Sequence, residues 1–407
     1  MEIHKLRSIV RVGIKNYLKL LICLSPGATS LFAEGANEIN VKLLVPEVIY
    51  AVPDIETNVY YDNIVTTVNS ANYVFEVKCK KGRNDEKRWR FTPKPEDVGE
   101  HPWVLNVIDS SGKIVDYAKS KIIVCPANAG EGKKLTVLMM GASQTAASVY
   151  PAHICGLMSK KGNPVFRTIG SRGTKNFPEL RHEGWGGWGW DSFFTRYNLA
   201  ESDKNDGLHP QRPQEANSRF IFEENGKPVF DFKKYCEKYN DGASPDAVTI
   251  LLGINNVFFG TDDTMEDIMK KKVYPYLEEM ISEFRRVSPN VIIGVGLLPP
   301  PASSQDAFGA NYGCQQTRWQ VRKNLDHFNR ALISKAKVLG FDIIPFHINL
   351  DTENGFPTRE EAVNVDSSQK IARQSNAFHP AQSGYQQMGD TVYAWLKYQL
   401  HKGGLKP

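Results

Sequence analysis

Three residue types with complementary chemistry occur in separate short motifs of this chain: Ser143, Asn255 and His379. A serine hydroxyl becomes a nucleophile when a histidine takes its proton. An asparagine amide can donate a hydrogen bond to the oxygen that becomes negative when a carbonyl is attacked. Each residue alone also fits a structural role, as a helix cap, a turn residue or a structural histidine. Together they are the parts of a site for acyl transfer, provided that the fold brings them together.

The elements that must position these residues are those of an α/β domain. Continuous apolar runs, typical of parallel strands buried on both faces, occur at residues 135–140, 164–169, 247–252, 291–298 and 341–345. Helical patterns occur at residues 265–287, 318–339 and 382–401. This alternation predicts a mostly parallel sheet covered by helices. Ligands of such sheets bind beyond the carboxyl ends of the strands, where Ser143 and Asn255 are expected.

The first part of the chain has a different pattern. Between residues 39 and 125, segments rich in β-branched and aromatic residues alternate with turn signals, and no helical run interrupts them. Residues 73–79, for example, alternate with a period of two. Short strands at this spacing predict a small all-β sandwich of the immunoglobulin-like kind over residues 38–127. A glycine-containing linker at 126–132 then leads to the α/β domain, predicted over 133–407.

Residues 1–33 have the pattern of a signal peptide. A basic front precedes a short apolar run, and the small residue Ala33 marks a plausible cleavage point. The run is too short and too broken to span a bilayer, so we expect a secreted or periplasmic protein without stable membrane insertion. The alternative is an ordinary helical or disordered N-terminus. Because this segment carries five basic residues and one acidic residue, its removal lowers the formal net charge from +5 to +1. A chain this close to neutral is not expected to bind nucleic acid.

Four motifs in the same order give the chain a resemblance to the SGNH hydrolase superfamily, also known as GDSL esterases and lipases. Residues 141–145 (Gly-Ala-Ser-Gln-Thr) resemble its Gly-Asp-Ser-x-Thr motif, and residues 253–256 (Gly-Ile-Asn-Asn) resemble Gly-x-Asn-Asp. Residues 376–380 (Asn-Ala-Phe-His-Pro) resemble Asp-x-x-His-Pro. Residues 169–171 and 182–188 resemble a stretch of the acetylxylan-esterase-like branch. The resemblance covers roughly residues 135–401 and implies a three-layer α/β/α domain behind the all-β sandwich.

The resemblance implies acyl transfer through a covalent intermediate, without cofactor or metal. Ser143 would attack an ester carbonyl while His379 takes its proton as general base. The N–H groups of Ser143 and Gly187 and the side chain of Asn255 would hold the oxyanion. Two other glycines are alternatives to Gly187 as the backbone donor: Gly170 and Gly173. The histidines form no recognisable metal-ligand pattern: His153, His182, His209 and His347.

Asn376 is the departure with most consequence, because it stands where the family has the acid that orients His379. An asparagine can accept a hydrogen bond from imidazole, but it carries no charge to stabilise imidazolium. Three hypotheses remain open. The site is a Ser–His dyad helped by a neutral acceptor, or the acid comes from elsewhere, such as Asp366 or Asp351, or the protein is degenerate and only binds. The other motifs favour an active enzyme.

Three indoles lie beside Gly187 in the run from Trp185 to Trp190. Trp185 and Trp188 are expected to pack against the apolar faces of sugars, and the alternative is that Trp188 and Trp190 only hold an irregular loop in place. Glu183 either positions the substrate or supports that loop. We expect an ester hydrolase acting on O-acyl groups, foremost O-acetyl groups of polysaccharides or other glycans. The alternatives are a broad carboxylesterase or lipase, or a catalytically weak carbohydrate-binding protein on the same scaffold.

Six cysteines occur in the chain, and five of them follow the predicted signal peptide. Cys79 and Cys125 both fall in predicted strands of the N-terminal region and are a candidate disulfide in an oxidising compartment. Buried free thiols are the alternative, and they are the expectation for most of the five.

Overall fold

The computed structural model describes residues 41–197 and 217–403 of the chain. The predicted signal peptide, residues 1–33, and His209 lie outside the described residues. In the described part, residues from Val41 onward form one compact unit of mixed α/β structure. No described helix is long and apolar enough to cross a membrane.

The largest sheet of the described chain has seven strands, six of which run parallel, and its central part has the spatial order β11-β10-β16-β17-β18. Their bounds are β10 (Lys134–Gly141), β11 (Val165–Ile169), β16 (Ala247–Leu251), β17 (Ile292–Gly296) and β18 (Asp342–Ile344). These strands match the five predicted apolar runs. Each is apolar because helices cover both faces, and the first strand lies between the second and the third, so the order reverses beside β10. Such a reversal is the usual ligand-binding position of an open α/β sheet.

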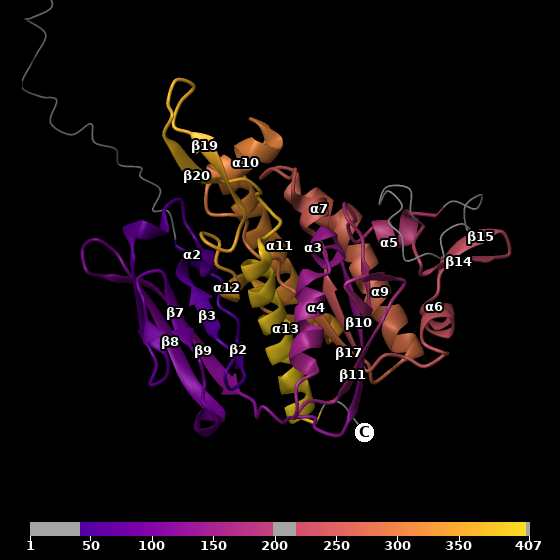
Figure 1. Ribbon diagram of the computed structural model, residues 1–407. Helices are drawn as coiled ribbons and strands as arrows, with labels where there is room; N and C mark the ends of the chain where they lie inside the picture. The colour runs from indigo at the N-terminus through magenta and orange to yellow at the C-terminus, as the bar shows by residue number, and fades with distance from the viewer. Residues whose placement is uncertain (1–40, 198–216, 404–407) are drawn as a thin grey trace, which may run out of the picture. The chain divides into compact units, whose positions relative to one another are not determined.

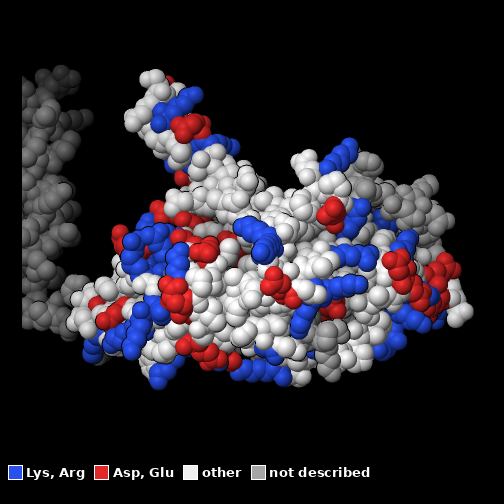
Figure 2. Space-filling view, turned by 60° about the horizontal axis from the view of Figure 1, so that its bottom comes forward, with Lys and Arg blue, Asp and Glu red and all other residues white. Residues whose placement is uncertain are grey.

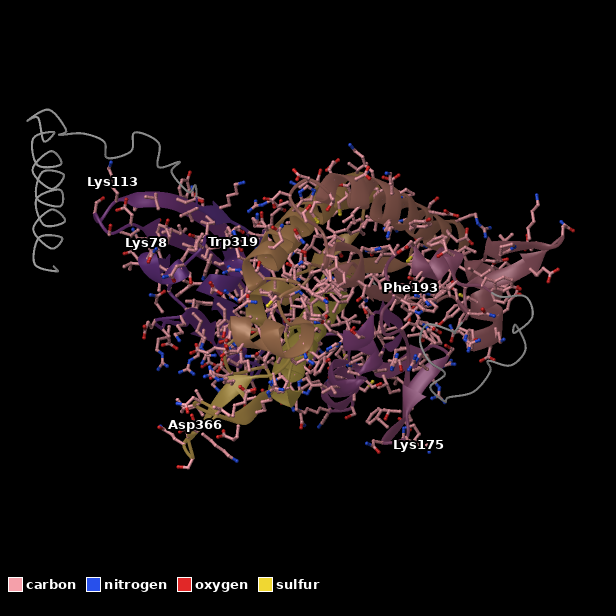
Figure 3. The ribbon with its side chains drawn as sticks, turned by 90° about the horizontal axis from the view of Figure 1, so that it is seen from above. Lys78, Lys113, Lys175, Phe193, Trp319 and Asp366 are labelled. Atoms are coloured by element: carbon pink, nitrogen blue, oxygen red, sulfur yellow. The ribbon has the colours of Figure 1, made fainter. Side chains whose placement is uncertain are left out.

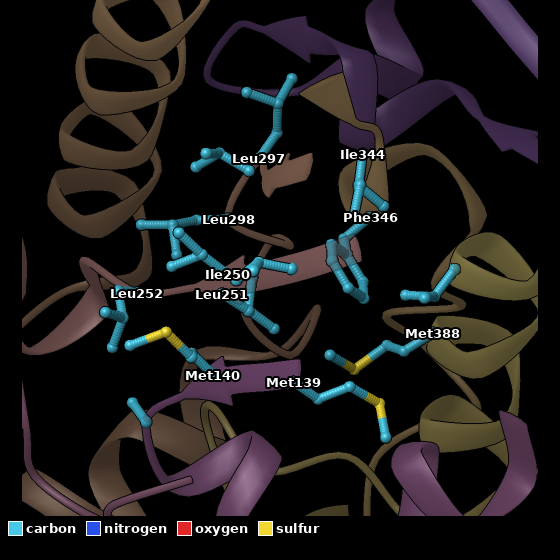
Figure 4. Close-up of a cluster of buried hydrophobic side chains, with 14 of the residues drawn as sticks. Met139, Met140, Ile250, Leu251, Leu252, Leu297, Leu298, Ile344, Phe346 and Met388 are labelled. Atoms are coloured by element: carbon cyan, nitrogen blue, oxygen red, sulfur yellow. The ribbon is translucent and has the colours of Figure 1, made fainter. Parts of the chain in front are cut away.

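Two further strands extend the sheet on the β10 side: β12 (Arg172–Thr174) and β13 (Phe177–Gly184). β13 pairs in parallel with only the end of β10, where Met140 lies opposite Glu183 and Gly141 opposite Gly184. The side chains of β10 and β16 form the centre of the core together with residues of the following strands (Figure 4). Met139 and Met140 of β10 and Ile250 of β16 are at most 1% exposed.

Three of the four long helices that cover the sheet lie where helices were predicted, one of them divided, and the fourth, α4, was not predicted. Figure 1 shows α4 (Val149–Met158) and α13 (Gln382–His401) on one face, and α9 (Tyr274–Val287) and α11 (Arg318–Leu339) on the other. The helix predicted over 265–287 is divided into α8 (Met265–Ile268), a π-helical turn (Met269–Val273) and α9. Pro275 lies in the first turn of α9, where its missing N–H and fixed φ are tolerated.

The N-terminal region is built mainly of strands, as predicted, and two of them, β8 and β9, are long. One sheet has the order β2-β9-β8-β5 and a second has the order β3-β7-β6. The bounds are β2 (Val48–Ala51), β3 (Thr57–Tyr60), β5 (Val74–Lys78), β6 (Arg83–Asn84), β7 (Arg88–Phe91), β8 (Gly99–Ile108) and β9 (Ile114–Val124). A short pair, β1 (Lys42–Leu43) with β4 (Val65–Thr66), and the helical turn α2 (Tyr61–Ile64) complete the region. Trp89 and Trp103 are at most 1% exposed in a second hydrophobic cluster, which also includes Ile348 of the α/β part.

Polar side chains join this region to the α/β part. That the region is an independent immunoglobulin-like domain remains a prediction. The carboxylate of Asp62 binds Arg318 at 2.6 Å and Arg322 at 3.0 Å, both from α11. The side-chain oxygen of Asn349 accepts from the backbone N–H of Asn58 at 2.8 Å and from its amide at 3.1 Å. Because these groups are partly or wholly buried, the two regions share one interface and not a flexible linker alone.

The remaining described elements are short and decorate the carboxyl-end edge of the sheet or its flanks. Two antiparallel hairpins are β14 (Ile221–Glu224) with β15 (Lys227–Phe230), and β19 (Thr358–Ala362) with β20 (Lys370–Gln374). The short helices are α3 (Ser143–Ala146), α5 (Ser192–Thr195), α6 (Phe232–Tyr239), α7 (Ile254–Val257), α10 (Gln305–Tyr312) and α12 (Phe346–Asn349). On the face shown in Figure 2, Lys and Arg residues lie among Asp and Glu residues.

The described cysteines are all free thiols, so the candidate bridge between Cys79 and Cys125 does not form in this structure. Cys125 is fully buried and Cys79 is partly exposed. Burial raises the pKa of the Cys125 thiol to about 12, which leaves it protonated and unreactive at neutral pH. The alternative expectation of buried free thiols holds for Cys125, Cys155 and Cys236, whereas Cys314 is exposed.

Candidate active site

The nucleophile turn connects the end of β10 to α3. The strand ends at Gly141, and Ser143 is the first residue of α3. A Cβ atom at Gly141 would collide with the side chain of Thr145, so the turn requires glycine at this position. Thr145 is fully buried and exchanges a 2.7 Å hydrogen bond with the hydroxyl of Tyr150. The glycine and the threonine of the motif therefore fix the turn, and the serine is left partly exposed at its apex.

The structure brings Ser143 and His379 together across 236 residues of sequence. The Oγ atom of Ser143 and the Nε2 atom of His379 are 2.8 Å apart, within hydrogen-bond distance. His379 lies in the loop between β20 and α13, and its imidazole is partly exposed. For Ser143 to donate its proton to Nε2, the imidazole must be neutral with its own hydrogen on Nδ1. This geometry is that of a nucleophile with its general base.

Burial lowers the pKa of His379, and no described carboxylate opposes this shift. A neighbouring carboxylate would favour imidazolium and raise the pKa. The imidazole is therefore neutral, and able to accept a proton, over most of the physiological pH range. Among the described residues, the dyad lacks an acidic third member.

Asn376 does not contact the imidazole ring as the family motif predicts. Its side-chain oxygen accepts from the backbone N–H groups of Phe378 at 3.0 Å and His379 at 2.9 Å. An oxygen that receives two backbone donors in this way closes a tight local turn. Asn376 thus positions the backbone that carries His379, and it leaves the ring itself without an oriented acceptor from this residue.

The two acids named from the sequence as substitutes are also placed elsewhere. The carboxylate of Asp351 accepts from the backbone N–H groups of Glu353 at 3.0 Å and Asn354 at 2.9 Å. Asp366 is exposed near the tip of the β19–β20 hairpin, away from the strand ends (Figure 3). Neither residue acts on His379, so of the three hypotheses the described geometry favours the Ser–His dyad over a displaced acid.

Asn255 and the loop that contains Gly187 are held together at the end of β16. The amide nitrogen of Asn255 donates to the carbonyl oxygen of Trp188 at 2.8 Å. The side-chain oxygen of Asn256 accepts from the backbone N–H of Trp190 at 3.0 Å, and its amide donates to Asp191 at 2.8 Å. An asparagine amide has two N–H groups, so Asn255 keeps one for another acceptor.

Gly187 is the exposed glycine among the three candidate backbone donors. Its φ is +77°, and a Cβ atom there would meet no neighbour within 4 Å. Its N–H has no backbone acceptor within the described ranges. A Cβ atom at Gly170 would instead press on the backbone of His182, and one at Gly173 would press on the carbonyl of Leu180. Close packing explains those two glycines, so the surroundings favour Gly187 as the donor.

The side chains predicted to contact substrate are buried, which argues against that role. Trp188 and Glu183 are 0% exposed and Trp185 is 4% exposed. The two indole rings stack with their centroids 4.9 Å apart. The Glu183 carboxylate accepts from Trp185 Nε1 and from the Tyr235 hydroxyl, each at 3.0 Å, and from the backbone N–H of Ser171 at 2.6 Å. Burial raises the pKa of Glu183. These residues support the loop, which was the structural alternative for them.

A second Ser–His pair has the same geometry as the first but is buried, which gives it a structural role. Ser148 Oγ and His182 Nε2 are 2.8 Å apart, the same distance as in the first pair. His182 is 1% exposed, and its Nδ1 accepts from the backbone N–H of Gly184 at 3.0 Å. Burial lowers the pKa of His182 to about 3, so the ring stays neutral and braces β13. No substrate can reach this pair.

An aromatic cluster next to the His379 loop was not predicted from the sequence. Phe258 packs against Phe378, the neighbour of His379, with ring centroids 5.1 Å apart, and against Tyr312 at 4.6 Å. Phe259 packs edge-on against Phe258 at 4.4 Å and is 66% exposed. The signal was present in the Phe-Phe pair shortly after Asn255. Only the fold shows that these rings and the His379 loop form one surface.

No model of a known protein family matches the chain, and no curated protein matches it in sequence. Among solved structures, the chain is similar to a family 3 carbohydrate esterase of Clostridium thermocellum, with 14% identity, a TM-score of 0.39 and coverage of 66% of this chain and 100% of that one. For an acetyl esterase mutant with acetate ion, the values are 14%, 0.36, 66% and 99%. For a protein of Chitinophaga pinensis described as a possible lipase, they are 14%, 0.35, 65% and 98%. Similarities of this size assign neither family nor activity. The support for a function therefore comes from the geometry of the site.

Proposed function

We propose that the protein is a serine ester hydrolase that cleaves O-acyl esters through an acyl-enzyme on Ser143. The observation that carries this proposal is the 2.8 Å contact between Ser143 Oγ and His379 Nε2 at the carboxyl-end edge of the sheet. The resemblance of four motifs to those of the SGNH superfamily supports it, because these motifs supply the nucleophile Ser143, its base His379 and the candidate oxyanion donor Asn255. The signal-peptide pattern of residues 1–33 supports export.

The reaction proceeds in two steps with His379 acting in both. Nε2 takes the hydroxyl proton as Oγ attacks the ester carbonyl, and it then gives that proton to the departing alkoxide, leaving an ester on Ser143. Water, deprotonated by the same nitrogen, attacks this ester, and the proton returns to Oγ as the acid leaves. The N–H groups of Ser143 and Gly187 and the free N–H of Asn255 stabilise the oxyanion in both steps. One such donor is worth about 3 kcal/mol in the transition state.

Acylated carbohydrates are the substrate class that we favour within this function. Trp185 and Trp188 are buried, so the support comes from Phe259, which is 66% exposed. Phe259 is linked through Phe258 to Phe378, the neighbour of His379. An exposed aromatic face packs well against the apolar face of a sugar ring. The small apolar esters of a broad carboxylesterase would use the same surface. Comparing simple acetates with acetylated xylan separates these two substrate classes.

A second candidate function, carbohydrate binding with little catalysis, follows from one observation. No described carboxylate acts on His379, so the imidazolium formed during acyl transfer has no charged partner. In serine proteases with a Ser-His-Asp triad, replacing the aspartate by asparagine lowers turnover about ten-thousand-fold. Retained hydrolysis that depends on Ser143 distinguishes the enzyme from the binding protein.

The test is hydrolysis of ethyl acetate, an aryl acetate and acetylated xylan by the mature protein and by Ser143→Ala. Ser148→Gly is the matched control, because it removes the hydroxyl of the buried Ser–His pair and glycine fits the φ of +62° at that position. We expect activity in the wild type and in Ser148→Gly, and none above background in Ser143→Ala. Equal activity in wild type and Ser143→Ala would refute the nucleophile, and inactivity of the wild type on all three would favour the binding protein.

A further inference from the structure

One buried hydrogen bond links the nucleophile turn directly to the histidine loop. The amide nitrogen of Gln144, the residue after Ser143, donates to the carbonyl oxygen of Phe378, the residue before His379, at 2.9 Å. Gln144 is 7% exposed and Phe378 is likewise 7% exposed. A buried hydrogen bond to a backbone carbonyl is costly to lose, since both groups have given up water.

This bond runs alongside the reacting contact. Ser143 and His379 are neighbours in sequence of the two bonded residues, so the Gln144–Phe378 bond spans the same gap between α3 and the loop. On the loop side, the oxygen of Asn376 accepts from the N–H groups of Phe378 and His379. The peptide before His379 is therefore held at its carbonyl by Gln144 and at its N–H groups by Asn376.

The hydrogen bond of Gln144 matters for the orientation of the His379 imidazole, because no described acid holds the ring. In a Ser–His–Asp site, a carboxylate on Nδ1 holds the imidazole in the orientation that faces the serine. No described carboxylate acts on His379, and the Asn376 oxygen is occupied by backbone donors. The orientation of the ring then depends on the backbone that carries it, and the one side chain that ties this backbone to the nucleophile turn is that of Gln144, among the described hydrogen bonds.

We propose that Gln144 is a positioning residue of the dyad, whose hydrogen bond to the Phe378 carbonyl holds His379 against Ser143 in place of an acid on the imidazole. This inference rests on the proposed function and deepens it. Gln144 touches neither substrate nor the reacting atoms, so its loss lowers kcat and the reactivity of Ser143 and leaves KM nearly unchanged. A displacement of reacting groups by about 1 Å costs on the order of 100-fold in rate.

The experiment compares wild type, Gln144→Leu and Gln144→Glu in ethyl acetate hydrolysis and in the rate of labelling by an alkyl fluorophosphonate. Leucine keeps the volume and removes the donor, so we expect kcat and labelling to fall by about 10- to 100-fold with KM within about twofold. Glutamate can donate to the carbonyl only when it is protonated. Its rate relative to wild type should therefore rise as the pH falls, whereas the relative rate of Gln144→Leu should not depend on pH.

Gln399→Leu is the control for the loss of a buried glutamine bond elsewhere. Gln399 is 0% exposed, lies in the last turn of α13, at the opposite end of that helix from the His379 loop, and donates to Asp342 at 2.6 Å. It should lower the melting temperature without changing kcat. A folded Gln144→Leu with wild-type kcat and labelling would overturn the inference, as would a pH-independent ratio for Gln144→Glu if leucine at this position does not fold. A wild type that is inert towards both reagents would instead overturn the proposed function.

Discussion

At the scale of single residues, His379 has to be neutral before it can take a proton from Ser143. Burial lowers its pKa below the ordinary value of about 6.5, and the described residues supply no carboxylate to raise it. A depressed pKa means that the base form survives to lower pH. The rate is then lost only at pH values below those at which an ordinary histidine would be protonated.

We therefore predict that the acidic limb of the kcat/KM profile has its midpoint below pH 6.5, and that Asn376→Asp moves it upward. The new carboxylate lies beside His379 and favours imidazolium, which raises the pKa by about one unit. The measurement is the pH profile of aryl acetate hydrolysis, with Asn364→Asp in the exposed hairpin as the control for added charge. A wild-type midpoint at or above 6.5, or no shift in Asn376→Asp, would contradict this account of the histidine.

Phe259 should determine how well the site accepts an ester that carries a ring. Phe259→Ala removes a face that is 66% exposed, and aromatic contacts of this kind are worth about 1 kcal/mol. We expect kcat/KM for acetylated xylan oligomers to fall about fivefold, with that for ethyl acetate unchanged. Val365→Ala, at a side chain that is 96% exposed in the hairpin, is the control. Equal losses on both esters would show that Phe259 has a structural role only.

At the scale of elements, periodicity and composition predicted the α/β region well because its strands are buried on both faces. The run at 135–140 became β10, and the helix predicted at 382–401 has the same bounds as α13. The strands β12 and β13, which pair antiparallel with each other and of which β13 pairs in parallel with the end of β10, were not predicted. β13 carries the polar residues Arg181, His182 and Glu183, which interrupt the apolar pattern of a buried strand. His182 and Glu183 are buried because their polar groups find hydrogen-bond partners.

The site was predictable to the extent that it follows strand ends. The motifs and the sheet rule both direct Ser143 and Asn255 to the same edge, whereas Gly187 was predicted from the resemblance alone. The support of the loop by Glu183 and the stacking of Trp185 on Trp188 depend on burial, which the sequence of an irregular loop does not reveal. The surroundings of His379 depend on which distant carboxylates reach it, and that is a property of the whole fold.

The nucleophile turn gives a prediction at this scale. In Gly141→Ala the new Cβ collides with the side chain of Thr145, so the turn must shift and the protein should lose about 2 kcal/mol of unfolding free energy together with most of its activity. Gly156→Ala is the matched control, because a Cβ there meets nothing within 4 Å in the middle of α4. That change should stabilise the protein by about 0.5 kcal/mol. Urea unfolding and ester hydrolysis measure both, and a stable, active Gly141→Ala would contradict the geometry of the turn.

At the scale of the whole molecule, the N-terminal region is joined to the α/β part by groups that have left water. Burial opposes ionisation of Asp62, but Arg322 and Arg318 overcome it and lower the pKa of the carboxyl. Arg322 is 7% exposed and also donates to the carbonyl oxygens of Asp62 and Val65. The sequence predicts two domains because the hydrophobic patterns of the two regions differ. Polar contacts between distant residues leave no local sequence pattern, so the interface between the regions could not be predicted.

Asp62→Ala should therefore destabilise the whole described unit and not the N-terminal region alone. Removing one partner of a buried ion pair leaves Arg322 uncompensated, which costs about 3 kcal/mol. Urea unfolding followed by tryptophan fluorescence should show one transition at a lower midpoint. Lys94→Ala is the control, because its ion pair with Asp54 is exposed on both sides. Two separate transitions, with that of the α/β part unchanged, would show that the regions fold independently.

The central claim is that Ser143, activated by His379, forms a covalent bond to the acyl group. The most direct measurement is intact-protein and peptide mass spectrometry after brief reaction with an aryl acetate or an alkyl fluorophosphonate. We expect one adduct on the peptide that contains Ser143. It should be absent from Ser143→Ala, form much more slowly in His379→Ala and form at the wild-type rate in Ser148→Gly. An adduct on another residue, or ester hydrolysis that persists in Ser143→Ala without any adduct, would contradict it.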